Sequence, residues 1–256
     1  MHNVPGNNNL SLLLKNNISP HDYALKLKDI KAIKSADLII WVGEDLECFL
    51  VKLFKDSSLV NNLLTVQLLG GIHKLPCRNS NQLDEHLWLY PKNASVIVES
   101  IAKRLIELDP VNTNKYLVNK QNFLIKIANN NNLINNKLSN IKHKNYVVFH
   151  DAYQYFEKFY GLNAPLVISD HPELPLSAKK MLDINLSIKQ NNIQCIFKEP
   201  QFDPKIINFL QNKNKFLKIG CLDPLGMDKD LGPDGYFKLL NNLADALSGC
   251  LEADKL

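Results

Sequence analysis

The chain has 256 residues, 45% of them apolar and 22% charged, which is long enough to bury a sizeable core in one large domain or two lobes. Thirty basic and 26 acidic side chains leave a formal charge of only +4, which argues against a dedicated nucleic-acid-binding protein. A mean hydropathy of −0.17 and the lack of an apolar run of about 18 residues exclude a membrane-spanning protein.

The first residues, MHNVPGNNNLSLLLKNNIS, do not read as a secretory signal peptide. They have no basic start, and their apolar stretch from Leu10 to Leu14 is short and interrupted by Ser11. We therefore expect either a cytosolic chain or a leader outside this sequence. The five cysteines do not choose between these options, since free cysteines are common in protein cores.

Short apolar runs alternate with longer amphipathic runs, a pattern typical of an α/β protein. Strands separated by helices favour parallel sheets, with ligands at the carboxyl ends of the strands. We expect strands at residues 37–43, 63–69, 145–150, 164–169, 193–198 and 216–221. We expect helices at residues 22–35, 45–55, 93–108, 152–160, 176–191 and 233–247.

Residues 112–141 carry no strand signal, and their apolar side chains recur at three-, four- and seven-residue steps. This spacing predicts one amphipathic helix of about 30 residues, or about 45 Å, that links two lobes. Two shorter helices, broken at the run Asn129–Asn132, are the alternative. The predicted division is a first lobe at 1–111, a linking helix at 112–142 and a second lobe at 143–256.

Three histidines lie at predicted element ends, where ligands gather: His21, His86 and His150. His21 follows Ser19 and Pro20 before a predicted helix, whose N-terminus would keep its imidazole neutral. A single histidine is more often structural or exposed than a metal ligand. With 65 residues from His21 to His86 and 64 from His86 to His150, spacing alone does not establish a shared metal site.

Five segments resemble, in order, motifs of the zinc-uptake ABC transporter substrate-binding proteins, the ZnuA-like (cluster A-I) family of periplasmic metal-binding proteins. They are PHDYALKLKDIKAIKSADLIIWVG, HLWLYPKNA, YVVFHDAYQYFEKFYGL, CIFKEPQF and LDPLG. The resemblance runs from about residue 10 to the C-terminus. It implies an α/β fold of two lobes with parallel sheets, joined by one long backbone helix, with metal in the cleft between the lobes.

The resemblance places the family's three histidine ligands on His21, His86 and His150. Three neutral imidazoles suit Zn²⁺ and leave a fourth tetrahedral position, which Asp223 or water would fill. Zinc-specific members often have Glu before the first histidine, where this chain has Pro20. Asp223 also fits a purely turn-forming role before a proline. Manganese prefers more carboxylates, so zinc is the favoured ion.

Cys195 and Cys250 match the family's disulfide pair, and two buried free thiols are the alternative. A disulfide over this 55-residue separation would stabilise the fold by about 4 kcal/mol in the loop-entropy model and would require an oxidising compartment. Cys48, Cys77 and Cys221 have no partner in the family pattern. We expect Cys221 in the core and Cys77 in a polar loop.

Two stretches depart from the family pattern. Residues 70–85 take the place of a His- and Asp-rich loop but are short, so we interpret them as a connecting loop. The strand and helix that open other family members are missing, which predicts a first sheet lacking an internal strand. The chain would then start at an internal Met, or the gene has decayed.

Function follows from the resemblance: a periplasmic, monomeric zinc-binding protein that delivers Zn²⁺ to a membrane ABC permease, with no nucleic-acid partner and no enzyme activity. Affinity should fall as the histidines protonate, and Asp151 or a backbone carbonyl would orient a ligating imidazole. The alternatives are a truncated, weakly binding or non-functional remnant, and a manganese-binding relative. A zinc hydrolase or lyase is a further one, but the sequence has no HExxH, no Gly-x-Ser-x-Gly and no evident general base.

Overall fold

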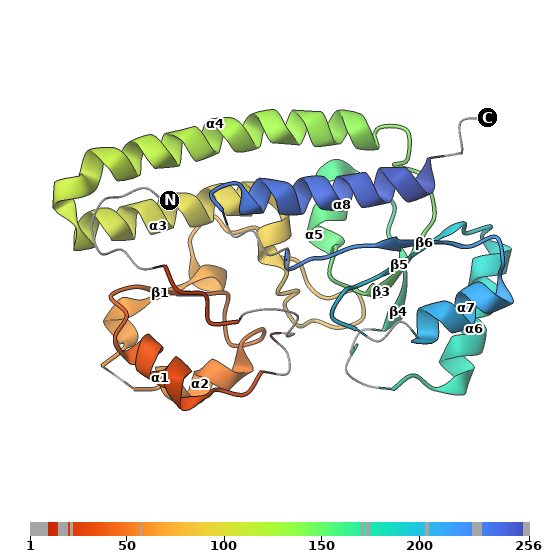
Figure 1. The fold of residues 1–256 in the computed structure, drawn as a ribbon, viewed down its shortest axis with the longest axis horizontal. Helices are drawn as coiled ribbons and strands as arrows, with labels where there is room; N and C mark the ends of the chain where they lie inside the picture. The colour runs from red at the N-terminus through yellow and green to blue at the C-terminus, as the bar shows by residue number, and fades with distance from the viewer. Residues whose placement is uncertain are drawn as a thin grey trace. The chain divides into compact units, whose positions relative to one another are not determined.

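The computed structural model describes residues 10–14, 20, 23–56, 58–169, 172, 175–202, 205–226 and 232–252. The chain divides into two compact units, Met1–Asn129 and Asn130–Leu256, here called unit 1 and unit 2 (Figure 1). Each unit contains its own parallel sheet, so the predicted α/β class with two parallel sheets is confirmed. The predicted limits of the lobes and of the linking region stay predictions.

Unit 1 contains a two-stranded parallel sheet with helices before, between and after its strands. Ile39 pairs with Leu63 and Trp41 with Thr65. The elements are α1 (Leu27–Lys34), β1 (Ile39–Trp41), α2 (Cys48–Phe54), β2 (Leu63–Thr65), α3 (Pro91–Leu108) and the 3-10 turns Val60–Asn62, Val66–Leu68, Leu87–Leu89 and Pro110–Asn112. The strand predicted at 63–69 therefore ends at Thr65, because the 3-10 turn Val66–Leu68 begins directly after it.

Side chains of α1, α2 and the following loop form the apolar core of unit 1. Ile33 of α1 packs in one cluster with Leu50 and Phe54 of α2. The ring of Trp41 in β1 meets Phe54 edge-on at 4.8 Å between centroids, and its Nε1 donates to Thr65 Oγ1 at 2.7 Å. The Trp41 side chain thus packs the strand pair against α2 and also hydrogen-bonds one strand to the other.

The start of α1 differs from the prediction. The helix begins at Leu27, five residues after the predicted start at residue 22. Ser19 and His21, the predicted cap and the histidine predicted beside it, lie outside the described residues. The acid that caps this helix is Asp29, whose Oδ2 accepts from the backbone N–H of Lys26 at 2.9 Å and from the Tyr23 hydroxyl at 2.7 Å. An acid three residues after the cap satisfies an otherwise unpaired N–H, which explains the later start.

One uninterrupted helix, α4 (Thr113–Leu138), carries the chain from unit 1 into unit 2. Its 26 residues confirm the predicted long helix, and the alternative of two helices broken at the asparagine run is wrong. Asn130 is buried within unit 2, where its Oδ1 accepts from Asn241 Nδ2 at 2.8 Å, while Asn129 and Asn132 are exposed. Asparagines on a solvated helix face cost little, so the run does not end the helix.

Unit 2 is built on a four-stranded, all-parallel sheet of strand order β4-β3-β5-β6. Its central strand β3 is buried along its whole length, as its continuous apolar run predicts. The elements are β3 (Val147–His150), α5 (Gln154–Tyr160), β4 (Leu166–Ser169), α6 (Ala178–Gln190), β5 (Cys195–Lys198), α7 (Lys205–Lys213), β6 (Lys218–Cys221) and α8 (Gly235–Leu251). The six predicted strands are all confirmed with shorter bounds, whereas α7 was not predicted.

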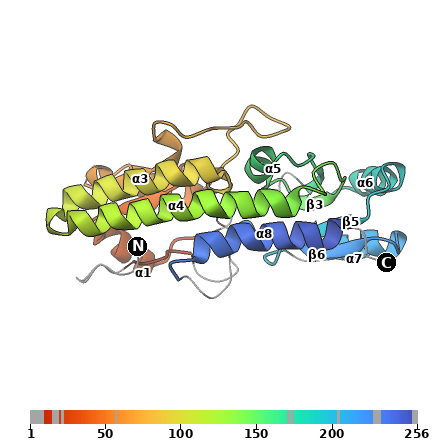
Figure 2. The ribbon, with the colours of Figure 1, turned by 90° about the horizontal axis from the view of Figure 1, so that it is seen from above.

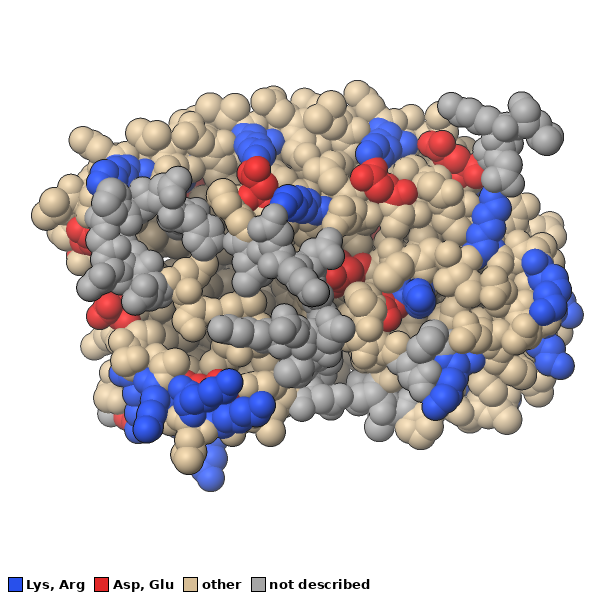
Figure 3. Space-filling view, in the orientation of Figure 1, with Lys and Arg blue, Asp and Glu red and all other residues tan. Residues whose placement is uncertain are grey.

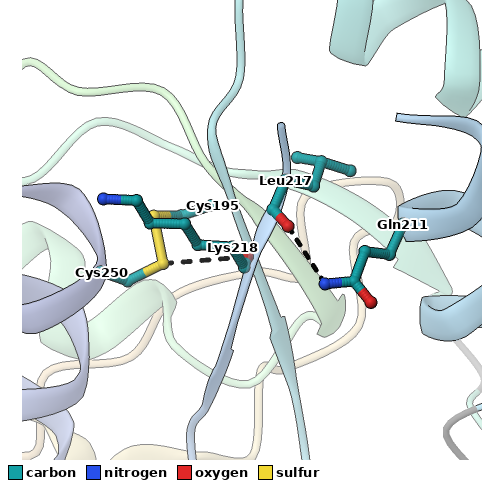
Figure 4. The surroundings of a disulfide bond; sticks show 5 residues. All are labelled: Cys195, Gln211, Leu217, Lys218 and Cys250. Carbon is teal, nitrogen blue, oxygen red and sulfur yellow. Dashed lines mark hydrogen bonds between the residues drawn. A yellow bond between two sulfur atoms is a disulfide. The ribbon is translucent and has the colours of Figure 1, made fainter. Parts of the chain in front are cut away.

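Helix α8 is attached to its neighbours in unit 2 by polar and covalent contacts. It runs beside the second half of α4, where Lys137 forms an ion pair with Asp245 (Figure 2). A disulfide joins Cys250 of α8 to Cys195 of β5, with 6.0 Å between the Cα atoms (Figure 4). The predicted pair is therefore confirmed, and the alternative of two free thiols is wrong.

The other three cysteines take no part in the disulfide, and one of them differs from its prediction. Cys221 is exposed rather than part of the core, because it ends β6, the edge strand of the sheet. Cys48 is also exposed, and Cys77 is partly buried. Exposed thiols at an element end carry no packing role, so Cys221 contributes little to the core of unit 2.

Charged side chains of both signs are interspersed over much of the face drawn in Figure 3. A group of basic side chains lies over α1 and α2 on this face, and Lys28, Lys31 and Lys34 of α1 and Lys52 of α2 are exposed. Among the described residues, none of the helices combines the length and the apolar character needed to cross a membrane.

Candidate metal centre

His86 of unit 1 is held by the carboxylate of Asp84. Its Nδ1 lies 2.9 Å from Asp84 Oδ1, and its backbone N–H donates to the same oxygen at 3.1 Å. The two side chains are only 5% and 3% exposed. A carboxylate can only accept, so this contact keeps the proton on Nδ1 and leaves the lone pair of Nε2 for a metal ion.

The fold around this pair fixes both side chains. Pro76 and Leu83 form an antiparallel bridge, and the backbone N–H of Asp84 donates to Leu75 O at 2.9 Å. Asn93, in the first turn of α3, is fully buried and hydrogen-bonds to the backbone at both ends of residues 73–87. Its Oδ1 accepts from His73 N at 2.7 Å, and its Nδ2 donates to Leu87 O at 3.1 Å. The backbone before His86 is therefore fixed by hydrogen bonds.

Glu85 adds a second carboxylate beside the pair, and ligand atoms of Asp84, Glu85 and His86 all lie within 4.8 Å of one another. Burial raises the pKa of the Glu85 carboxyl, and Asp84 and Asp45 act in the same direction, while His86 opposes them. Because Asp45 lies in the loop after β1, the turn that carries His86 lies near the carboxyl end of that strand. The sequence prediction treated both acids only as members of a connecting loop, although an acid two residues before a candidate ligand is a usable signal.

His150 of unit 2 is the last residue of β3 and is 6% exposed. Its Nδ1 lies 3.7 Å from Oε1 of Glu199, the residue that follows β5. Val148 of β3 pairs with Phe197 of β5, and two further residues along this parallel register lead to His150 and Glu199. The ring of Phe202 lies edge-on to the imidazole, with 6.1 Å between centroids.

Asp223 lies two residues after β6 and is partly buried. Its Oδ1 accepts from the backbone N–H groups of Leu225 at 3.0 Å and Gly226 at 3.1 Å, so the turn-forming role left open by the sequence is present. Gly226 has φ +65°, and a Cβ there would lie 2.9 Å from Leu239 Cδ1, so the turn requires glycine. One oxygen of Asp223 is thereby committed to the backbone.

Tyr153 links the ends of β3 and β6. Its hydroxyl donates to Leu222 O at 3.2 Å, across the carboxyl edge of the sheet. Burial, followed by the nearby Glu199 carboxylate, raises the pKa of Tyr153 well above its ordinary value, and Asp223 acts in the same direction. The phenol therefore stays protonated and can keep donating to the Leu222 carbonyl.

The structure thus places the predicted ligands in two groups. His150 and Asp223 share the carboxyl edge of the unit 2 sheet, together with Glu199, which the sequence prediction did not single out. His86 lies in unit 1 with Asp84. His21 lies outside the described residues.

A family model and named relatives match most of this chain. The family model described as "Zinc-uptake complex component A periplasmic" matches residues 2–250. The high-affinity zinc uptake system protein ZnuA of Haemophilus ducreyi is 34% identical over 266 residues, covering 94% of this chain and 85% of the relative. The protein of the same name from Yersinia pestis is 32% identical over 268 residues, covering 94% and 84%.

Solved structures show the same fold. A zinc-bound ZnuA deletion mutant superposes with a TM-score of 0.82 at 26% identity, covering 95% of this chain and 90% of that one. The periplasmic zinc-binding protein TroA of Treponema pallidum also gives a TM-score of 0.82, at 21% identity and coverages of 94% and 90%. At that identity, the second likeness concerns the fold alone.

Proposed function

This chain belongs to the family of periplasmic zinc-uptake complex components, and on that premise we propose that it binds Zn²⁺ outside the cytoplasm with high affinity and delivers it to a membrane ABC permease for import. The observation that carries the proposal is the buried pair of Asp84 and His86, 2.9 Å apart. The contact holds a proton on Nδ1, which makes Nε2 the nitrogen that would bind Zn²⁺ when the imidazole is neutral.

The proposed ligands are His86, His150 and His21, with Asp223 or water in the fourth position. Imidazoles outnumber carboxylates in this set, which favours zinc over manganese. Zn–N distances of about 2.0–2.1 Å demand well-fixed rings, and both described histidines are buried at the ends of braced elements. Because Asp223 Oδ1 already accepts two backbone hydrogen bonds, its other oxygen is the one that would bind the ion.

The extracytoplasmic location draws support from the bond between Cys195 and Cys250. Disulfides persist in oxidising compartments and are rare in the reducing cytosol. The chain acts in this proposal as a monomeric carrier and not as an enzyme, with zinc as cargo. The ion is held by side chains that must be neutral or anionic, so protons compete with it.

Zinc titration of the oxidised chain against a chromophoric chelator tests the proposal. We expect one tight equivalent per chain, lost or strongly weakened in His86→Ala and His150→Ala. His143→Ala is the matched control, because His143 is exposed and lies outside the proposed ligand set. Unchanged zinc binding in either ligand variant would refute the assignment of that residue. No competition by the wild-type chain would instead favour a non-functional remnant of the family.

A further inference from the structure

A buried carboxylate with an unsatisfied oxygen lies at the carboxyl edge of the unit 2 sheet. Glu199 is 1% exposed, and its Oε2 accepts from Gln201 Nε2 at 2.8 Å. Within the described part of the chain, no donor has hydrogen-bond geometry to its other oxygen, Oε1. The Tyr153 hydroxyl lies near this carboxylate, but its geometric hydrogen bond goes to Leu222 O. A buried acceptor without a donor destabilises the folded state, so we looked for a nearby group that could donate a hydrogen bond to Oε1.

The imidazole of His150 is placed to supply that donor. Its Nδ1 lies 3.7 Å from Oε1, since His150 ends β3 and Glu199 follows the neighbouring strand β5 at the same level of the register. A shift of about 1 Å would bring the pair to a charge-assisted hydrogen bond. Phe202 lies edge-on to the imidazole and covers part of its apolar surroundings.

We propose that Glu199 is the positioning residue for His150: its Oε1 accepts a hydrogen bond from Nδ1–H, and this selects Nε2 as the atom that ligates zinc. The inference rests on the proposed zinc site and deepens it. A ligating imidazole needs its second N–H satisfied, and a buried N–H without an acceptor would weaken the metal complex. Asp84 makes the corresponding contact to His86 at 2.9 Å, so each unit supplies one histidine and one buried carboxylate behind it.

Glu199→Gln tests this role, because it keeps the shape of the side chain and removes the charge. We expect zinc affinity, measured by chelator competition, to fall about 10- to 100-fold, the usual effect of losing such a partner. Asp183→Asn is the matched control, since it removes one exposed charge from α6 of the same unit and should leave affinity unchanged. A Glu199→Gln variant that binds zinc as tightly as the wild type would overturn the proposal.

Nitrogen NMR of the zinc-loaded wild type provides a second test that requires no variant. We expect the His150 ring to carry its proton on Nδ1, shifted downfield by the hydrogen bond, and this shift to be reduced in Glu199→Gln. A proton on Nε2 would mean that zinc binds Nδ1 and would overturn the proposal even if the variant failed to fold. Failure of the wild type to bind zinc at all would refute the proposed function, which is a different result from tight binding that ignores Glu199.

Discussion

The carboxylate of Asp84 contacts His86 twice, at the backbone N–H and at Nδ1, and both side chains are almost fully buried. The first contact fixes the turn, and the second sets the position of the ring proton. A neutral residue of the same shape would separate these effects from simple packing. The pair therefore permits a direct test of whether the carboxylate itself prepares the ligand.

Asp84→Asn should weaken zinc binding about 10- to 100-fold while the chain stays folded. The amide can still accept one hydrogen bond, but it no longer provides the negative charge that favours a proton on Nδ1. Chelator competition measures the affinity, and Asp37→Asn, at an exposed site in the same unit, is the control. Wild-type affinity in Asp84→Asn would show that the contact only supports the turn.

The candidate ligands could be predicted from the sequence, but the residues that contact them could not. His86 and His150 were identified in the sequence, but their partners Asp84 and Glu199 were not assigned to them. Glu199 lies 49 positions after His150, and only the pairing of β3 with β5 brings the two together. Asp84 is close in sequence, but its role depends on a buried turn, and no periodic pattern marks such a turn.

At the scale of elements, the apolar runs of the sequence predicted every strand that the described residues form, although the strands are shorter than the runs. Buried parallel strands give strong signals because both of their faces are covered. Helix α7 was missed, although the parallel pairing of β5 with β6 requires a crossover connection, which is usually a helix. The start of α1 was placed too early, because the acid that accepts from the backbone at its first turn, Asp29, lies seven residues after the predicted start.

The disulfide between β5 and α8 is the element contact with the largest expected effect on stability. Replacing Cys195 by Ala and Cys250 by Ser together should lower the free energy of unfolding by about 2–5 kcal/mol, because the open chain gains conformational freedom. Urea unfolding under oxidising conditions measures the change. Cys221→Ser, at an exposed free thiol, should shift stability by less than about 0.5 kcal/mol. Equal stability of the wild type and the double variant would contradict this role for the bond.

At the scale of the whole molecule, the proposed site draws ligands from two units that each fold around their own sheet. An ion bound only by the complete set of ligands stabilises the folded chain by mass action, since the unfolded chain does not assemble the set. Zinc binding would then raise the free energy of unfolding of the whole chain. The size of that effect depends on pH, because protons and zinc compete for the same imidazole nitrogens.

Saturating zinc should therefore raise the midpoint of thermal unfolding. With free zinc about 100-fold above the dissociation constant, the gain is about 2.7 kcal/mol, or about 5–10 °C for a chain of this size. The gain should be largest at neutral pH and shrink in mildly acidic solution, since protonated imidazoles no longer bind the ion. Scanning calorimetry with zinc or with a chelator at both pH values measures it, and His143→Ala should behave like the wild type. A gain that ignores pH, or that persists in His86→Ala, would mean that zinc stabilises the chain at another site.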